Sequence, residues 1–290
     1  MIPFKGCLDL PMIHLKLNPG MQWVITFLAV VIKPTYMILS LLLIIWLWRA
    51  PEPSLRLLRW ALIFFLSGEM FCALNYLLTN SQSDLLEILH SLGMVGMSML
   101  LPWGFLLLLD DRIIHFSNKN SKCELIKLCD SCWKFTDAAC KFKQLSWFAI
   151  PAVAAVALLP LPAPINSSHV VTWVLGNESH FVLSPLLQWL EFRIFPLLAC
   201  FFMLVSLFFL TGNMTGLKKA QGLFFMGFGF MLYSLLKFLL NSGFAGLPQW
   251  ANFWEEITEL MMVVGLAIFL GLFHRQLHLT LPWSKTDQEM

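Results

Sequence analysis

Long runs of hydrophobic residues, separated by short polar segments, dominate the 290-residue chain. A helix needs roughly 20 apolar residues to cross the hydrocarbon core of a membrane. Runs of this length predict seven transmembrane helices, over residues 22–48, 59–79, 85–109, 145–164, 183–211, 217–241 and 254–274. We therefore expect an all-α, polytopic membrane bundle that forms one domain, residues 22–274, between two short tails, 1–21 and 275–290.

The composition agrees with a protein that is built for lipid. Hydrophobic residues make up 58% of the chain and charged residues 12%, whereas soluble domains contain about 25% charged residues. The net charge is only +2, so it carries no indication of a polyanionic ligand. The lipid bilayer is the expected partner, and no nucleic acid is expected.

The positions of lysine and arginine predict the orientation, because short basic loops stay in the cytoplasm. Fourteen of the nineteen Lys and Arg residues follow the first, third, fifth and seventh predicted helices. The N-terminal tail has two, and the loops after the second, fourth and sixth helices have none. The N-terminus and loop 163–182 are therefore expected on the outer side of the membrane, and loop 110–144 and the C-terminus on the cytoplasmic side. The expected location is the plasma membrane or an inner membrane.

Loop 110–144 contains a cluster of cysteines at Cys123, Cys129, Cys132 and Cys140. Stable disulfides are rare in the reducing cytoplasm, so a metal centre is one hypothesis. Cys129 and Cys132 form a C-x2-C pair, a spacing common in zinc and iron–sulfur sites. Cys123 and Cys140 complete four ligands, which predicts a bound zinc ion or iron–sulfur cluster.

The same segment also fits an amphipathic helix on the membrane surface. At about 100° per residue, its cysteines and large hydrophobic residues fall on one face, and its charged residues on the other. In such a helix Cys132 and Cys140 are about 12 Å apart along the axis, too far to share one metal. A thiol redox role is a third hypothesis, and loop 110–144 is a candidate docking segment for a cytoplasmic protein.

Ionisable residues inside the predicted spans are the candidate ligand-binding or proton-binding residues. Such residues are costly in lipid and usually face a bundle interior or a watery cavity. They are Lys33, Glu69, His90, Glu191, Arg193, Lys237 and Glu259. Because the helices alternate in direction, all of them map to the outer half or the midplane of the bilayer. This predicts an outward-facing polar chamber lined by every helix except 145–164, with its floor near Lys33 and Glu69.

Three further glutamates, Glu87, Glu255 and Glu256, lie at the ends of predicted spans, and we expect them at the water interface. With them, the spans contain six carboxylates against three lysine and arginine side chains. Such an acidic excess favours binding of a proton or a cation. The alternative is that the charges form structural ion pairs, which often add little net stability.

Three classes of function are consistent with the sequence. The chamber can bind a small polar or cationic ligand, or protons, in transport or coupling. It can instead hold a quinone or a lipid headgroup in a redox or enzyme subunit, with the cysteines as the metal centre. The third class is a sensor or assembly subunit in which the basic loop binds a partner.

Overall fold

The computed structural model describes residues 19–109, 141–165, 168–174, 177–210, 214–244, 248–274 and 277. The first long helix consists of α1 (Pro19–Phe27), a π-helical turn η1 (Leu28–Ile32) and α2 (Lys33–Leu47). The fifth long helix along the chain is divided in the same way, into α6 (Pro185–Trp189), a π-helical turn η4 (Leu190–Ile194) and α7 (Phe195–Leu210). The other helices are α3 (Pro53–Thr79), α4 (Asp84–Leu109), α5 (Lys141–Ala157), α8 (Met214–Gly243) and α9 (Pro248–Phe273).

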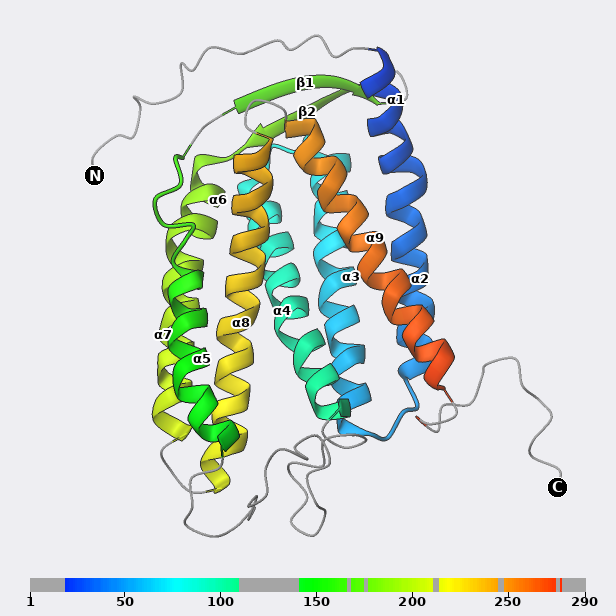
Figure 1. The fold of residues 1–290 in the computed structure, drawn as a ribbon. Helices are drawn as coiled ribbons and strands as arrows, with labels where there is room; N and C mark the ends of the chain where they lie inside the picture. Colours follow the sequence, from blue (N-terminus) through cyan, green and yellow to red (C-terminus); the bar gives the residue numbers. More distant parts are fainter. Residues whose placement is uncertain are drawn as a thin grey trace, which may run out of the picture.

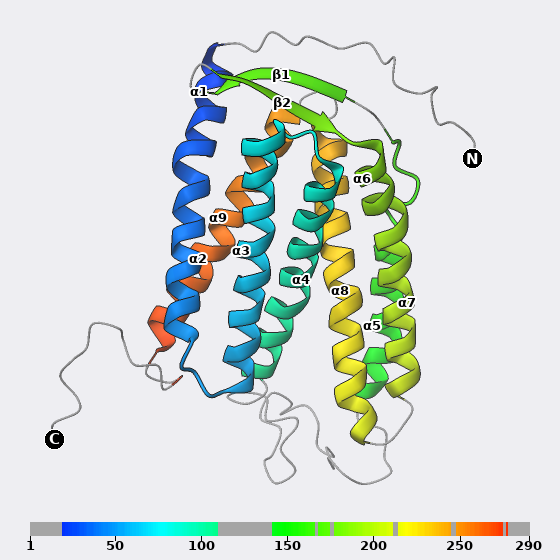
Figure 2. The same ribbon diagram turned by 180° about the vertical axis from the view of Figure 1, so that it is seen from behind.

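The helices run side by side and alternate in direction (Figure 1). Contacts link α2 to α3, α3 to α4, α4 to α8, α8 to α9 and α9 back to α2, so these five helices form a closed ring. The helices α7 and α5 lie beyond α8 on one side of the ring (Figure 2). This ring, with η4 beside it, surrounds the polar residues described below.

Within the described ranges, six helices are long and apolar enough to cross a membrane: Gln22–Leu47, Pro53–Thr79, Asp84–Leu109, Pro185–Phe209, Lys219–Gly243 and Gln249–Phe273. A shorter apolar helix, Phe148–Ala157, lies within α5. The architecture is therefore that of a multi-pass membrane protein. Whether α5 makes a seventh crossing, and which end of the bundle faces the cytoplasm, remain predictions.

The helix predicted over 145–164 is wrong at its C-terminal end, because α5 stops at Ala157. Beyond it lie Pro160, Pro162 and Pro164, which have no backbone N–H to donate to a preceding carbonyl. The chain continues as turns, in which the Leu161 and Ala163 amides donate to carbonyls three residues earlier. Hydrophobicity alone did not reveal this limit.

A β-hairpin occupies most of the predicted outer loop 163–182. Strand β1 (Ser168–Val174) pairs antiparallel with β2 (Asn177–Leu183), from Ser168 opposite Leu183 to Val174 opposite Asn177. Valine, threonine and aromatic residues favour strands in these segments. The hairpin crosses the end of the bundle where α1 begins (Figure 1), which we call the hairpin end. The all-α prediction holds for the bundle, and the hairpin lies outside it.

The helices α3 and α4 lie in close contact, which depends on facing glycines. A Cβ atom added at Gly93 would lie 2.7 Å from the Gly68 Cα and 2.8 Å from the Phe64 carbonyl oxygen. Small residues permit this approach in membrane helix pairs. The contact also allows the His90 Nδ1–H to donate to the Gly68 carbonyl at 3.0 Å, which places His90 beside Glu69.

We therefore expect Gly93→Ala to lower the free energy of unfolding by about 1–3 kcal/mol, as overpacking in a dense core does. Gly265→Ala is the matched control, because an added Cβ there meets nothing within 4 Å. Thermal melting of both variants in the same detergent measures the difference. Equal melting temperatures for the two variants would contradict the close contact.

Candidate functional site

A polar cavity of about 170 Å³ lies among α2, α3, α4, α6, η4, α8 and α9. Its lining extends from residues near the hairpin end, such as Ser81, Ser184 and Asn252, down to Glu69 and Glu259. Glu69 is ten residues, or about 15 Å, from the end of α3. The ionisable lining residues are Lys33, Glu69, Cys72, Glu87, His90, Glu191, Lys237, Glu255, Glu256 and Glu259.

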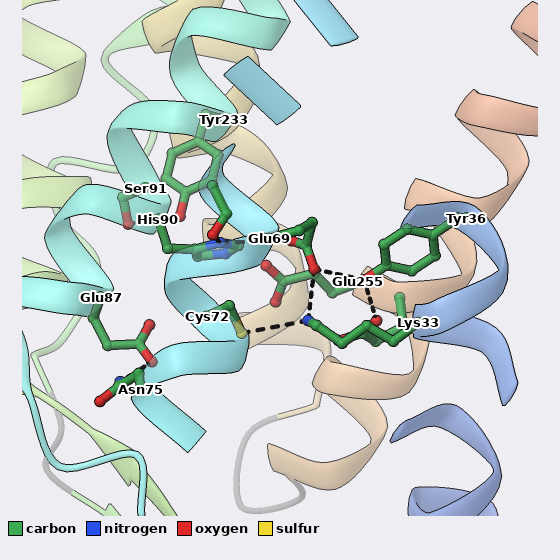
Figure 3. A network of polar contacts seen from close by, with 12 residues as sticks. Lys33, Tyr36, Glu69, Cys72, Asn75, Glu87, His90, Ser91, Tyr233 and Glu255 are labelled. Carbon is green, nitrogen blue, oxygen red and sulfur yellow. Dashed lines mark hydrogen bonds and ion pairs between the residues drawn. The ribbon is translucent and has the colours of Figure 1, made fainter. Parts of the chain in front are cut away.

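At the base of the cavity, Lys33 contacts two carboxylates and a thiol. Its Nζ lies 2.6 Å from Glu69 Oε2 and 3.1 Å from Glu256 Oε1, and it donates to Cys72 Sγ at 3.3 Å. Figure 3 shows Lys33 reaching from its helix toward Glu69 and Cys72 on the next helix. Lys33 therefore ties together α2, α3 and α9.

Tyr36, one helical turn from Lys33, bridges the same two carboxylates. Its hydroxyl oxygen lies 2.7 Å from Glu69 Oε2 and 2.6 Å from Glu256 Oε2. Tyr36 and Glu69 are each 0% exposed, so water does not share these contacts. The hydroxyl fixes the distance between a carboxyl group on α3 and one on α9.

A third carboxylate, on Glu259, completes the cluster. Carboxylate oxygens of Glu69, Glu256 and Glu259 all lie within 4.8 Å of one another, an arrangement that can hold a metal ion. Glu259 is only 5% exposed, and its Oε2 has no hydrogen-bond partner among the described residues. The base of the cavity therefore has carboxylate oxygen available for a ligand.

A second cluster lies around Glu191 and includes side chains of α4 and α8. The Tyr233 hydroxyl donates to Glu191 Oε1 at 3.0 Å and lies 2.8 Å from the Ser91 Oγ. Lys237 pairs with Glu255 at 2.5 Å, and its ammonium lies 5.6 Å from the centre of the Tyr233 ring. Two consecutive glutamates of α9 therefore bind lysines of different helices. Glu255 binds Lys237 on α8, and Glu256 binds Lys33 on α2.

The two π-helical turns place Lys33 and Glu191, and a proline follows each. Pro34 and Pro196 have no N–H, and a proline ring clashes with the carbonyl four residues earlier. The chain widens instead: the Lys33 amide donates to the Leu28 carbonyl, and the Phe195 amide to that of Leu190. Such π-bulges are frequent at functional sites.

Six of the seven residues that the sequence singles out line the cavity, and Arg193 does not. Its guanidinium donates to backbone carbonyls of Ala163 at 2.7 Å, Phe192 at 3.2 Å and Pro160 at 3.4 Å. The Phe192 carbonyl is the one that Pro196 leaves without its helical donor. Arg193 thus anchors the proline-rich turn after α5 to the fifth long helix.

Glu256 lies inside the bundle and not at the surface where the sequence predicted it. Its expected position at the water interface is wrong, since the residue is 8% exposed and bonded to Lys33 and Tyr36. The reason is that α9 begins at Pro248, six residues before the predicted start, so Glu256 lies more than two turns inside the helix. Glu87 also lines the cavity, where Asn75 donates to it at 2.7 Å.

The cysteine segment with Cys123, Cys129, Cys132 and Cys140 lies outside the described residues. The zinc or iron–sulfur hypothesis and the docking role of loop 110–144 therefore stay predictions. Among the described residues, Cys72 and Cys200 are free thiols, and Cys72 lines the cavity.

Comparison of the chain with protein-family models, with curated proteins and with solved structures finds no match. The function is therefore argued from the geometry and charge of the cavity.

Proposed function

We propose that the cavity binds a small cation and protons, as part of transport or coupling across the membrane. The observation that carries the proposal is the cluster of Glu69, Glu256 and Glu259, whose oxygens lie within 4.8 Å of one another. In the described part of the chain, Lys33 is the one lysine or arginine paired with any of them. The cluster thus has more acidic groups than lysines to neutralise them.

The cost of leaving this excess uncompensated is large. Two unit charges 4.8 Å apart repel by roughly 3 kcal/mol at an effective dielectric constant of about 20. Three ionised carboxylates contain three such pairs, and one lysine offsets only part of the repulsion. A bound cation or proton lowers this repulsion energy, which supports a site that binds a cation or a proton when the protein functions.

The size of the cavity limits the ligand. A volume of about 170 Å³ corresponds to roughly six waters at about 30 Å³ each. This space suits an inorganic cation with part of its hydration shell, or a small organic ammonium ion.

Two lysine–glutamate pairs line the route from the hairpin end to the base. A cation in the cavity lies beside both pairs, because Glu255 and Glu256 are consecutive residues of α9 and both line the cavity. In each pair, the cation can compete with the lysine ammonium group for the glutamate carboxylate. Below Lys33, buried leucines such as Leu43, Leu58 and Leu270 close the bundle, as an inner seal would in an outward-facing state.

Proton release from the purified protein tests the proposal. The full chain in weakly buffered detergent solution is titrated with sodium, potassium, magnesium or methylammonium chloride, and a pH-sensitive dye reports released protons. We expect saturable release with at least one cation, and unchanged release in Glu52→Gln, a glutamate immediately before α3 at the opposite end. No release with any of the four would contradict the proposal.

The orientation of the cavity is part of the proposal, because an outward opening rests on the distribution of basic residues. With the native cysteines replaced, a single cysteine at Ser168 should react with an impermeant reagent on intact cells, and one at Ser121 should not. The reverse pattern would place the hairpin end in the cytoplasm.

A further inference from the structure

Tyr36 has one hydroxyl proton but two carboxyl partners. Its oxygen lies 2.7 Å from Glu69 Oε2 and 2.6 Å from Glu256 Oε2, both within normal O–H···O distance. An ionised carboxylate only accepts hydrogen bonds. If both glutamates were ionised, the Tyr36 hydroxyl could donate to one of them, and the other contact would bring two oxygen lone pairs together without a proton between them.

The contacts of Lys33 indicate which carboxyl group carries the missing proton. Glu69 Oε2 already receives the Lys33 ammonium at 2.6 Å, so that oxygen is an acceptor. Glu256 Oε2 has Tyr36 as its close partner, while Lys33 contacts the other oxygen, Oε1. A proton on Glu256 Oε2 gives every short contact a donor and an acceptor: Glu256 donates to Tyr36, Tyr36 to Glu69, and Lys33 to both carboxyl groups.

We infer that Glu256 is a proton-binding residue, held as a carboxylic acid that donates to Glu69 through Tyr36. The second, independent observation is Glu259 Oε2, an oxygen of a side chain 5% exposed with no hydrogen-bond partner among the described residues. It lies in the same group of carboxylate oxygens. Glu256 and Glu259 thus supply adjacent positions for a proton and for a second positive charge.

Other charged or titratable groups face Glu256 from each neighbouring helix. They are Lys33 and Tyr36 on α2, Glu69 and Cys72 on α3, Glu87 and His90 on α4, Glu191 on η4, Lys237 on α8 and, on α9 itself, Glu255 and Glu259. Lys33 is the nearest cation, and it is already shared with Glu69. The acidic majority of these groups favours retention of the proton.

Release of the proton changes the charge of the cluster by one unit. The Glu256 Oε2–H bond breaks, the proton passes to water in the cavity, and Tyr36 keeps its own hydroxyl proton, bonded to one of the two carboxylates. The added negative charge then attracts a cation to the oxygens of Glu256 and Glu259. This step rests on the proposed function and specifies the residue that exchanges the proton.

Infrared spectroscopy of the full chain in lipid nanodiscs tests the inference. Glutamate labelled with heavy carbon at its side-chain carboxyl identifies a C=O stretching band from a protonated glutamate at neutral pH, sensitive to deuterium exchange. We expect this band in the wild type, its loss in Glu256→Gln and its retention in Glu255→Gln, the adjacent control. Tyr36→Phe should move the band to higher frequency, because the acid loses its acceptor.

A wild type without a protonated-glutamate band would overturn the inference without any variant. A band that survives Glu256→Gln would assign the proton elsewhere and overturn it as well. If Glu256→Gln does not fold, Tyr36→Phe decides, since an unmoved band excludes contact with the tyrosine. The proposed function can fail separately. If the wild type shows this band but releases no protons when cations are added, the protonated glutamate stands and the proposed exchange of protons for a cation is wrong.

Discussion

Lys33→Met should lower the free energy of unfolding by about 3–5 kcal/mol, the usual effect of removing one partner of a buried ion pair. Lys33 is 15% exposed and Glu69 is fully buried, so water cannot replace the lost ammonium group. The change leaves Glu69, Glu256 and Glu259 without a lysine. Thermal and denaturant unfolding in one detergent measure the loss.

Two comparisons separate this effect from a general loss of packing. Lys237→Met removes a lysine from a pair in which both side chains are 17% exposed, so we expect a smaller loss. Adding Glu69→Gln to Lys33→Met should restore part of the stability, because one uncompensated carboxylate is removed. A Lys33→Met protein as stable as the wild type would show that the pair has no structural role.

Glu259→Gln should have the opposite profile, with stability preserved and cation binding lost. Glutamine has nearly the same shape, and the change removes one of three adjacent acidic groups, so the melting temperature should stay equal or rise. The apparent cation affinity, read from the midpoint of the proton-release titration, should fall at least tenfold, about 1.4 kcal/mol of binding free energy. Functional sites often reduce stability in this way.

Glu259→Asp is the control that keeps the charge and shortens the side chain, and it should keep part of the release. A Glu259→Gln protein with normal proton release would remove this residue from the site. If Glu259→Gln melted well below the wild type, the carboxylate would be a structural group with a partner, contrary to its unpartnered oxygen.

The sequence was sufficient for the helical bundle and for the region of the cavity. Hydropathy located the long helices, because crossing a membrane requires long apolar runs. Ionisable residues in those runs then indicated one polar chamber, since they avoid lipid. Lys33 and Glu69 were both expected at the floor of this chamber, and their side chains are 2.6 Å apart.

The interior partners could not be predicted, because they depend on where helices begin and on how they rotate. Glu256 was assigned to the interface because the polar start of α9 did not resemble a membrane helix. The π-helical turns before Pro34 and near Pro196 break the regular rotation of about 100° per residue, so a helical wheel misplaces faces across them.

Tyr36 and Tyr233 were detectable from composition, although neither was among the predicted site residues. The chain has 26 phenylalanines and only three tyrosines, so a hydroxyl on an aromatic ring inside a span is unusual here. A buried tyrosine hydroxyl usually has a hydrogen-bond partner. Both residues donate to a predicted site residue, Tyr36 to Glu69 and Tyr233 to Glu191.

Ion exchange by the reconstituted protein is the most direct test of the central claim, that the glutamate cluster exchanges protons for a small cation. Proteoliposomes with an internal pH dye receive an external pulse of the cation that released protons in detergent. The account predicts a rise of internal pH in wild-type vesicles as the cation enters and protons leave, and none in Glu259→Gln vesicles. Wild-type vesicles that behave like protein-free liposomes, or Glu259→Gln vesicles that behave like wild type, would contradict it.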